Sequence, residues 1–309
     1  MNFAFTDDQL AFAALVREVL AAEHGVRGDK AWARLAGAGF FGLLVPEAYG
    51  GLGLRLVDAL PAVEEAGRAC VAGPVIDTLV ASPYVLGGGE LARVAAGELR
   101  VAAGAARVAD ADLADLLVLA GPAGSAAVLS PQSVRLAPHP SADPGRPLFE
   151  VEATGTGGVA VPDMWRALTV ATAAQLLGLA RHLLATSVEY ARQRVQFGRP
   201  IGSFQAVKHR LADVALAVEF AAPLVWRAAL SLGERDVSAA KAASGEAAEL
   251  AAGSALQVHG AIGYTHELPL RHWLARVWAL SAAHGSPAEH RARIRELLPG
   301  SANGEGRWP

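Results

Sequence analysis

The sequence is poor in cysteine, in net charge and in long apolar runs, and each shortage excludes a class of protein. Cys70 is the only cysteine among 309 residues, so an internal disulfide framework is excluded and a reducing cytoplasm is the expected compartment. A formal net charge of −3 and a pI near 6.3 argue against nucleic acid or another polyphosphate as a partner. The first residues are acidic where a signal peptide would be basic, and the longest apolar stretch, residues 168–180, is interrupted by Thr and Gln. We therefore expect a soluble cytoplasmic protein with no membrane partner, and no motif indicates a metal site.

Hydrophobic residues make up 52% of the chain, and their spacing along the sequence divides it into three regions. Residues 1–98 have a helical pattern, which opens at a capping box formed by Thr6 and Gln9. Residues 99–161 contain short apolar runs between Gly and Pro turns, at 116–120, 126–129 and 148–152, which predict strands of a small β domain. Residues 162–309 again have helical periods. The fold class that follows is mainly α with a small middle β domain.

The third region predicts an antiparallel bundle of four long helices. We place Ser203 at the start of the second helix, and Pro223 should kink that helix. A polar tail is expected over residues 301–309. The predicted helices cover residues 164–193, 203–232, 238–258 and 268–282, with a last short helix at 287–298.

Residues 190–205 form a basic junction between the first two bundle helices. Arg192, Arg194 and Arg199 surround a turn through Gly198 and Pro200, and a new helix begins after it. A helix N-terminus with nearby guanidinium groups suits a phosphate. Taken alone, Arg194 could equally be a cation that caps the end of a helix.

Four stretches of the chain resemble the acyl-CoA dehydrogenase family, in the family's order and spacing. They are Val45-Pro-Glu-Ala-Tyr-Gly-Gly-Leu-Gly53, Glu64-Glu-Ala-Gly-Arg68, Arg192-Gln-Arg-Val-Gln-Phe-Gly-Arg-Pro-Ile-Gly-Ser-Phe-Gln205 and Gln257-Val-His-Gly-Ala-Ile-Gly-Tyr-Thr-His-Glu267. The resemblance implies an N-terminal helical domain, a middle β domain, which is abbreviated here, and a C-terminal four-helix bundle. By themselves, Glu64 and Glu65 would be a solvated helix face, and the stretch 45–53 is best interpreted as an architectural turn.

The resemblance also implies FAD as the cofactor, bound across a subunit interface, and acyl-CoA as the substrate. The adenosine diphosphate half of FAD would be held by one subunit while its flavin lies mainly in another. Where the family commonly has two adjacent glycines, this chain has Gly260 and Ala261, which crowds the approach slightly. The residues that the resemblance assigns to this half-site are Arg194, Gln196, Phe197, Gln205, Gln257, Gly260 and Ala261. Without the motif, Phe197 would be interpreted as a core residue.

The chain departs from the family at the catalytic base. Family members remove the α proton of the acyl group with a carboxylate while a hydride leaves the β carbon for the flavin. At the usual position of that carboxylate this chain has His284, and at the alternative position it has Leu168. The chain also lacks the Gly-Ser-Asp and Thr-Glu-Pro segments with which members bind the flavin. Glu267 reads as a capping residue in the first turn of the next helix, so no catalytic residue is assigned.

These departures resemble short bacterial members that act on sterol side chains as heteromers. We expect the chain to be the base-lacking subunit, which supplies the half-site for adenosine diphosphate to a homologous partner subunit. One alternative is an independent homo-oligomer that uses His284 or another base, because imidazole is a common general base. His284 could instead be a polar residue before a helix N-terminus. A third alternative is a non-catalytic structural subunit. An electron-transfer acceptor is expected in the first two cases, and the acyl chain stays open.

Overall fold

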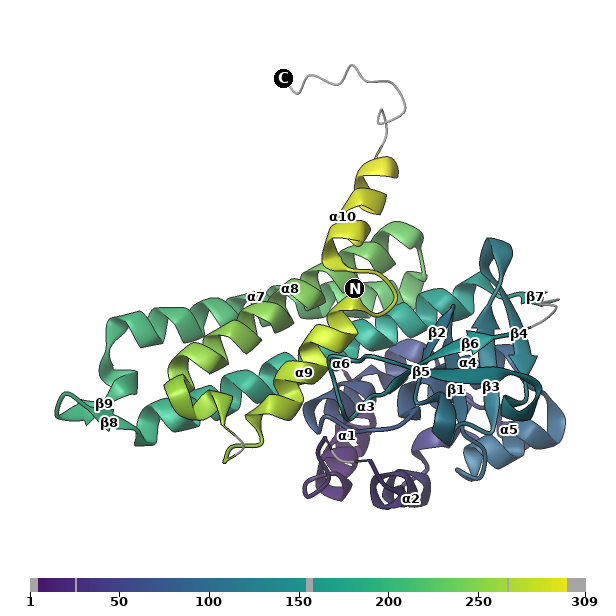
Figure 1. Ribbon diagram of the computed structural model, residues 1–309, viewed down its shortest axis with the longest axis horizontal. Helices are drawn as coiled ribbons and strands as arrows, with labels where there is room; N and C mark the ends of the chain where they lie inside the picture. Colours follow the sequence, from purple (N-terminus) through teal and green to yellow (C-terminus); the bar gives the residue numbers. More distant parts are fainter. Residues whose placement is uncertain (1–4, 26, 154–157, 266, 299–309) are drawn as a thin grey trace.

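The long helices of the C-terminal half form one lobe, and the N-terminal helices and the strands form the other (Figure 1). The computed structural model describes residues 5–25, 27–153, 158–265 and 267–298. The predicted tail at 301–309 lies outside these residues. The N-terminal helices are α1 (Asp7–Val19), α2 (Asp29–Gly37), α3 (Leu56–Arg68), α4 (Val75–Val85) and α5 (Gly88–Ala95). The C-terminal helices are α6 (Pro162–Gln193), α7 (Gln205–Ser231), α8 (Glu234–His259), α9 (Leu270–Ala282) and α10 (Pro287–Glu296).

The middle region consists of two small sheets. In the first, the strand order is β1-β3-β4-β7, with β1 parallel to β3 and the other pairs antiparallel. The second has the antiparallel order β2-β6-β5. Successive strand residues point to opposite faces, so Val101 and Ala103 join the main core while Ala102 joins a second, smaller core. The strands are β1 (Val101–Gly104), β2 (Arg107–Ala109), β3 (Leu116–Ala120), β4 (Ser125–Leu129), β5 (Arg135–His139), β6 (Leu148–Glu152) and β7 (Val159–Ala160).

Helix α6 is the centre of the fold, and it crosses α3 at two glycines. A Cβ atom on Gly178 would lie 1.9 Å from the carbonyl oxygen of Glu64, and one on Gly67 would lie 2.4 Å from that of Gln175. Only glycine therefore permits this close approach of the two helices. Glu64 pairs with Arg181 at 2.6 Å and Glu65 with Arg17 at 2.5 Å. Since Glu65 is buried, the Glu64–Glu65 pair is a packed ion-pair surface and not a solvated helix face.

The stretch 45–53 folds back on itself as an architectural turn. Leu52 donates its N–H to Gly42 and Gly53 donates to Val45, each at 2.8 Å. Gly51 lies so close to this chain segment that an added Cβ would be 2.0 Å from the Val45 carbonyl oxygen. The glycines are thus required by the backbone path.

Local predictions met different outcomes. The capping box at Thr6 and Gln9 is confirmed, with the two residues exchanging side-chain-to-backbone hydrogen bonds. The second bundle helix begins at Gln205, two residues after the predicted start at Ser203, whose hydroxyl donates to the carbonyl oxygen of Pro200. Glu267 does not lie in the first turn of α9, which begins at Leu270 after Pro269. Helix α7 continues across Pro223, and α8 begins four residues earlier than predicted.

Two helices, α6 and α7, are long and apolar enough to cross a membrane by length and composition alone. Within the most apolar window, 83% of α6 is buried inside the protein, which identifies it as a core helix. In α7 only 39% of the most apolar window is buried, and the exposed side chains of this helix include Leu216, Phe220 and Leu224. Exposed apolar faces of this kind are typical of protein–protein contacts.

Candidate cofactor site

The basic junction of residues 190–205 forms a small hairpin at the far end of the bundle (Figure 1). Strands β8 (Val195–Gln196) and β9 (Arg199–Pro200) pair antiparallel, and Phe197 and Gly198 connect them with φ values of +54° and +76°. Two left-handed residues are what a tight two-residue hairpin loop requires. The hairpin is fixed by the backbone of Arg194, which donates to Tyr190 and accepts from Ile201, both at 2.8 Å.

The side chains of the hairpin face solvent. Phe197 is 91% exposed, and its ring lies edge-to-face with that of Phe204 at a centroid distance of 6.1 Å. The guanidinium of Arg199 lies 4.1 Å from the centre of the Phe204 ring. Phe197 is therefore not the core residue that it would be without the motif. The guanidinium groups of Arg192 and Arg194 make no hydrogen bond or ion pair with any other residue that the structure describes. Free cations and an exposed aromatic ring suit a ligand or a partner chain.

A cleft of about 360 Å³ separates the hairpin from the end of α8. Its walls bring together Phe197 and Gln257, which are 60 residues apart in the sequence, and they add Phe204, Val207 and Arg210. The sequence analysis missed Arg210. Its signal was helical spacing, because residues three apart on a helix share a face and Val207 also lines the cleft.

The other residues of the predicted half-site lie beside the cleft and not in its walls. Gln205 is the first residue of α7, whose N-terminus has no side-chain cap and so leaves backbone N–H groups available. The amide of Gln196 is turned back to the carbonyl oxygen of Val195, at 2.8 Å. Gly260 ends α8 with φ of +65°, and the adjacent Ala261 is exposed.

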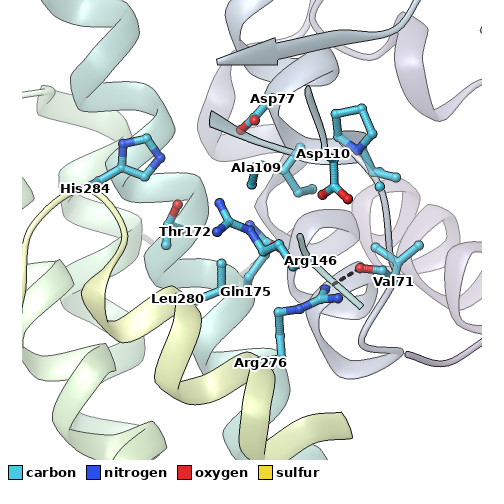
Figure 2. A pocket seen from close by; sticks show the side chains of 14 residues that line it. Val71, Asp77, Ala109, Asp110, Arg146, Thr172, Gln175, Arg276, Leu280 and His284 are labelled. Carbon is cyan, nitrogen blue, oxygen red and sulfur yellow. Dashed lines mark hydrogen bonds between the residues drawn. The ribbon is translucent and has the colours of Figure 1, made fainter. Parts of the chain in front are cut away.

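A second polar site is buried where the N-terminal helices, the sheets and the bundle meet (Figure 2). Arg276 of α9 forms an ion pair with Asp143, and it also donates to the carbonyl oxygens of Val71 and Gly145. Figure 2 shows Arg146 in the middle of the labelled side chains, with His284 on the bundle side and Asp77 and Asp110 on the other. The middle region, whose few charges suggested little chemistry, thus supplies Asp110, Asp143 and Arg146.

The charged groups of this cluster shift one another's pKa values, and they leave little space. Burial raises the pKa of Asp77, and it raises that of Asp110 to about 6 against the attraction of Arg146. Burial also lowers the pKa of Arg146, and the two carboxylates oppose this. The enclosed cavity has a volume of about 30 Å³, room for about two water molecules. Although a carboxyl with a pKa near 6 would suit a general base, an acyl thioester does not fit beside Asp110.

His284 lies in a loop that its neighbours hold rigidly. His284 and Gly285 have φ values of +56° and +102°. Nε2 of His290 lies 3.0 Å from the carbonyl oxygen of His284, and buried Lys241 donates to the carbonyl oxygens of Ser281 and Gly285, both at 2.9 Å. The next residue, Ser286, caps α10. The loop therefore has a structural role that does not require the imidazole to react.

The imidazole of His284 is a weak base. Burial lowers its pKa to about 3, and the charges of Arg146 and Lys241 add to this effect. His284 borders both the 30 Å³ cavity and an outer cleft of about 350 Å³, which Arg166 and Arg293 also line. A general base is most effective when its pKa lies near the working pH, and His284 is far from that condition.

Comparison with known proteins identifies the family. The N-terminal domain of acyl-CoA dehydrogenases matches residues 4–94, and the C-terminal domain of acyl-CoA dehydrogenases matches residues 167–298. The acyl-CoA dehydrogenase IpdE2 of Mycobacterium tuberculosis is 35% identical over 299 residues, which cover 92% of this chain and 89% of the relative.

Solved structures show the same fold. The ChsE4-ChsE5 complex from Mycobacterium tuberculosis contains a chain with a TM-score of 0.84 at 22% identity, covering 99% of this chain and 100% of the other. The Tcur3481-Tcur3483 steroid ACAD G363A variant also gives a TM-score of 0.84, at 24% identity, with coverage of 96% and 99%. The chain therefore belongs to the acyl-CoA dehydrogenase family, a family of FAD-dependent enzymes.

Proposed function

We propose that this chain is the base-lacking subunit of a heteromeric acyl-CoA dehydrogenase, in which it supplies the half-site for the adenosine diphosphate of FAD to a homologous partner subunit. The observation that carries the proposal is a contrast between two sites. The cleft at Phe197 is open and its cations are free, whereas charged side chains line a cavity of only about 30 Å³ beside His284. A chain with this arrangement can hold part of a cofactor at its surface, and its cavity beside His284 is too small for an acyl thioester.

The cleft fits adenosine diphosphate in its chemistry. Phe197 and Phe204 offer aromatic faces for a nucleobase, and the amide of Gln257 can exchange hydrogen bonds with its edge. The guanidinium groups of Arg194 and Arg210, together with the uncapped start of α7, can hold phosphate oxygens. When bound, FAD supplies the acceptor for the hydride of the acyl group. The residues of this chain would bind and orient its adenosine diphosphate half.

The exposed apolar face of α7 supports assembly with a second chain. Phe220 is 75% exposed on a helix that begins directly behind the half-site, and Leu216 and Leu224 lie beside it. Covering these side chains would stabilise a complex by about 25 cal/mol for each Å² removed from water. A half-site at the surface is useful only when another chain completes it, so the proposal requires at least a dimer.

The names of similar proteins support a steroid-derived substrate. One is a steroid ACAD, and another is a complex of two different chains, ChsE4 and ChsE5. We accordingly propose a sterol-derived acyl-CoA as the substrate class of the complex, which passes electrons to an external acceptor.

The test is to purify the full-length chain alone and together with its partner, and to measure flavin absorbance in each. We expect no flavin with the chain alone and stoichiometric FAD in the complex. In the complex, Arg194→Ala should weaken the affinity for FAD at least about tenfold. Stoichiometric FAD in the chain alone would overturn the proposal. Desaturation by the chain alone that is lost in His284→Ala would favour the independent enzyme. If Arg194→Ala and Gln257→Ala both leave FAD and activity intact, the structural-subunit alternative is favoured.

A further inference from the structure

A second groove, apart from the half-site, lies between α6, the end of α8, the start of α9 and the end of α3. Its volume is about 430 Å³, within the usual range of small-molecule sites. Most of its surface is apolar. The residues used below are Arg68, His182, Glu189, Tyr190, His259 and Trp273, all of which border this groove.

Aromatic rings form the walls of the groove in two stacked pairs. The rings of His182 and Trp273 are parallel within 4° at a centroid distance of 4.0 Å, and those of Tyr190 and His259 lie 4.4 Å apart. Burial lowers the pKa of His182 to about 4, and it also lowers that of His259. Both imidazoles are therefore neutral at physiological pH. The half-buried rings of His182 and Tyr190 border the groove as uncharged surfaces, and the buried rings of Trp273 and His259 support them from behind.

Arg68 is the one residue of the Glu64–Arg68 motif that packing does not explain. Its carbonyl oxygen accepts a hydrogen bond from Nε1 of Trp273 at 2.9 Å, which fixes its backbone against the groove wall. Its half-buried guanidinium makes no hydrogen bond or ion pair with any residue that the structure describes. It lies close enough to His182 to help lower the pKa of that imidazole. One end of the groove thus carries an unpaired, partly desolvated cation.

The groove is elongated and its two ends differ in charge. His182, Glu189 and Gln193 border it along α6, and a span of 11 residues on a helix covers about 16 Å. Glu189, at the far end, is held by the amide of Gln193 at 2.5 Å. A negative group at that end would repel a ligand that is anionic along its whole length.

We propose that this groove binds an elongated apolar monocarboxylate, with the carboxylate on Arg68 and the apolar body against the rings of His182 and Tyr190. A guanidinium pairs with a carboxylate through two parallel hydrogen bonds, which satisfies the free donors of Arg68. A neutral apolar molecule would leave these donors unpaired, and a phosphorylated ligand would gain nothing from the apolar walls. The inference does not depend on the half-site for FAD.

The test uses dodecanoate and its uncharged counterpart dodecanol, each titrated calorimetrically into the full-length chain. We expect one site for dodecanoate, with an affinity at least about tenfold above that of dodecanol. Arg68→Gln should abolish this preference. Ala185→Phe, at an exposed position that borders the groove, should abolish binding of both compounds. Arg93→Gln, an exposed arginine of α5, is the matched control and should change nothing.

Three results would overturn the inference. They are the absence of saturable binding, equal affinity for dodecanoate and dodecanol in the unaltered chain, and binding that survives Ala185→Phe. Circular dichroism and thermal unfolding of each variant establish that it is folded before the titration. Loss of dodecanoate binding in the complex with the partner subunit would reassign the groove to the subunit interface.

Discussion

Arg276 of α9 and Asp143 of the loop between β5 and β6 form an ion pair with side chains that are only 5% and 2% exposed. Through the same guanidinium, Arg276 reaches the carbonyl oxygen of Val71, just after the third helix. One side chain of the bundle thus holds the sheets and the N-terminal helices together. Burying a charge costs free energy unless an opposite charge pairs with it, and in this ion pair each side chain satisfies the other.

We predict that Arg276→Met lowers the free energy of unfolding by about 3–5 kcal/mol, because Asp143 is left buried without its counter-ion. Urea unfolding followed by circular dichroism measures the change. The control is Arg135→Met, which removes a surface pair with Glu152 at 3.5 Å and should cost less than about 1 kcal/mol. Similar losses for the two variants would mean that the buried pair does not hold the domains together.

The crossing of α3 and α6 makes a second prediction. Gly178→Ala places a methyl group against the carbonyl oxygen of Glu64, and we expect a loss of about 1–3 kcal/mol in stability. Gly253, also inside a helix, has open space around it, so Gly253→Ala should add about 0.5–1 kcal/mol. Opposite signs in urea unfolding would support the close crossing. A gain in both variants would contradict it.

The overall architecture was predictable because long periodic helices and motif spacing are strong signals. The α6–α9 bundle follows from helical periods and the small sheets from short apolar runs between Gly and Pro turns, and comparison confirms the family that four motifs indicated. The division at residues 98 and 161 stays a prediction. Errors fell at element ends: the Ser203 hydroxyl donates to the carbonyl oxygen of Pro200, and the local sequence does not distinguish this turn from the start of a helix.

The buried cluster was not predictable, since it depends on residues far apart in the chain. Asp77, Asp110, Arg146 and Arg276 lie on four different segments, and each resembled a surface charge in its local sequence. The half-site stays a prediction, and most of its residues come from one motif. Arg210 and Arg68 were missed as ligand candidates since nothing local distinguishes a free guanidinium from a paired one.

The neutral histidines predict acid sensitivity. Burial lowers the pKa of His290 to about 4, and that of His182 likewise, while the unfolded chain retains a pKa near 6.5. Between these values the unfolded state binds more protons, so stability must fall as the pH drops from 6.5 towards 4 and level off below. Each pH unit costs up to about 1.4 kcal/mol for a fully buried histidine. His290→Gln should flatten this dependence in urea unfolding at pH 7 and pH 5. An unchanged slope would show that the buried ring is not responsible.

Phe197 of the hairpin combines a strained backbone with a proposed role in FAD binding, and substitution can separate the two. Phe197 has a left-handed backbone with φ of +54°, and its side chain is almost fully exposed. Phe197→Gly therefore relieves backbone strain and removes almost no packing. We expect the stability of the chain alone to stay within about 1 kcal/mol of the unaltered protein, because the relief of strain and the added chain entropy offset each other. The same variant should retain FAD more weakly in the complex with the partner subunit, by about 1–3 kcal/mol for the loss of one aromatic stacking partner.

Ala123→Gly is the matched control, since Ala123 is exposed with the same φ of +54° at the opposite end of the molecule. It should leave FAD retention unchanged, as measured by flavin absorbance after dialysis of the complex. Equal FAD retention in the Phe197 and Ala123 variants would mean that the aromatic ring of Phe197 does not contribute to FAD binding. A loss confined to Phe197→Gly, in a chain of unaltered stability, would mean that the exposed ring is kept at a strained position because it binds the cofactor.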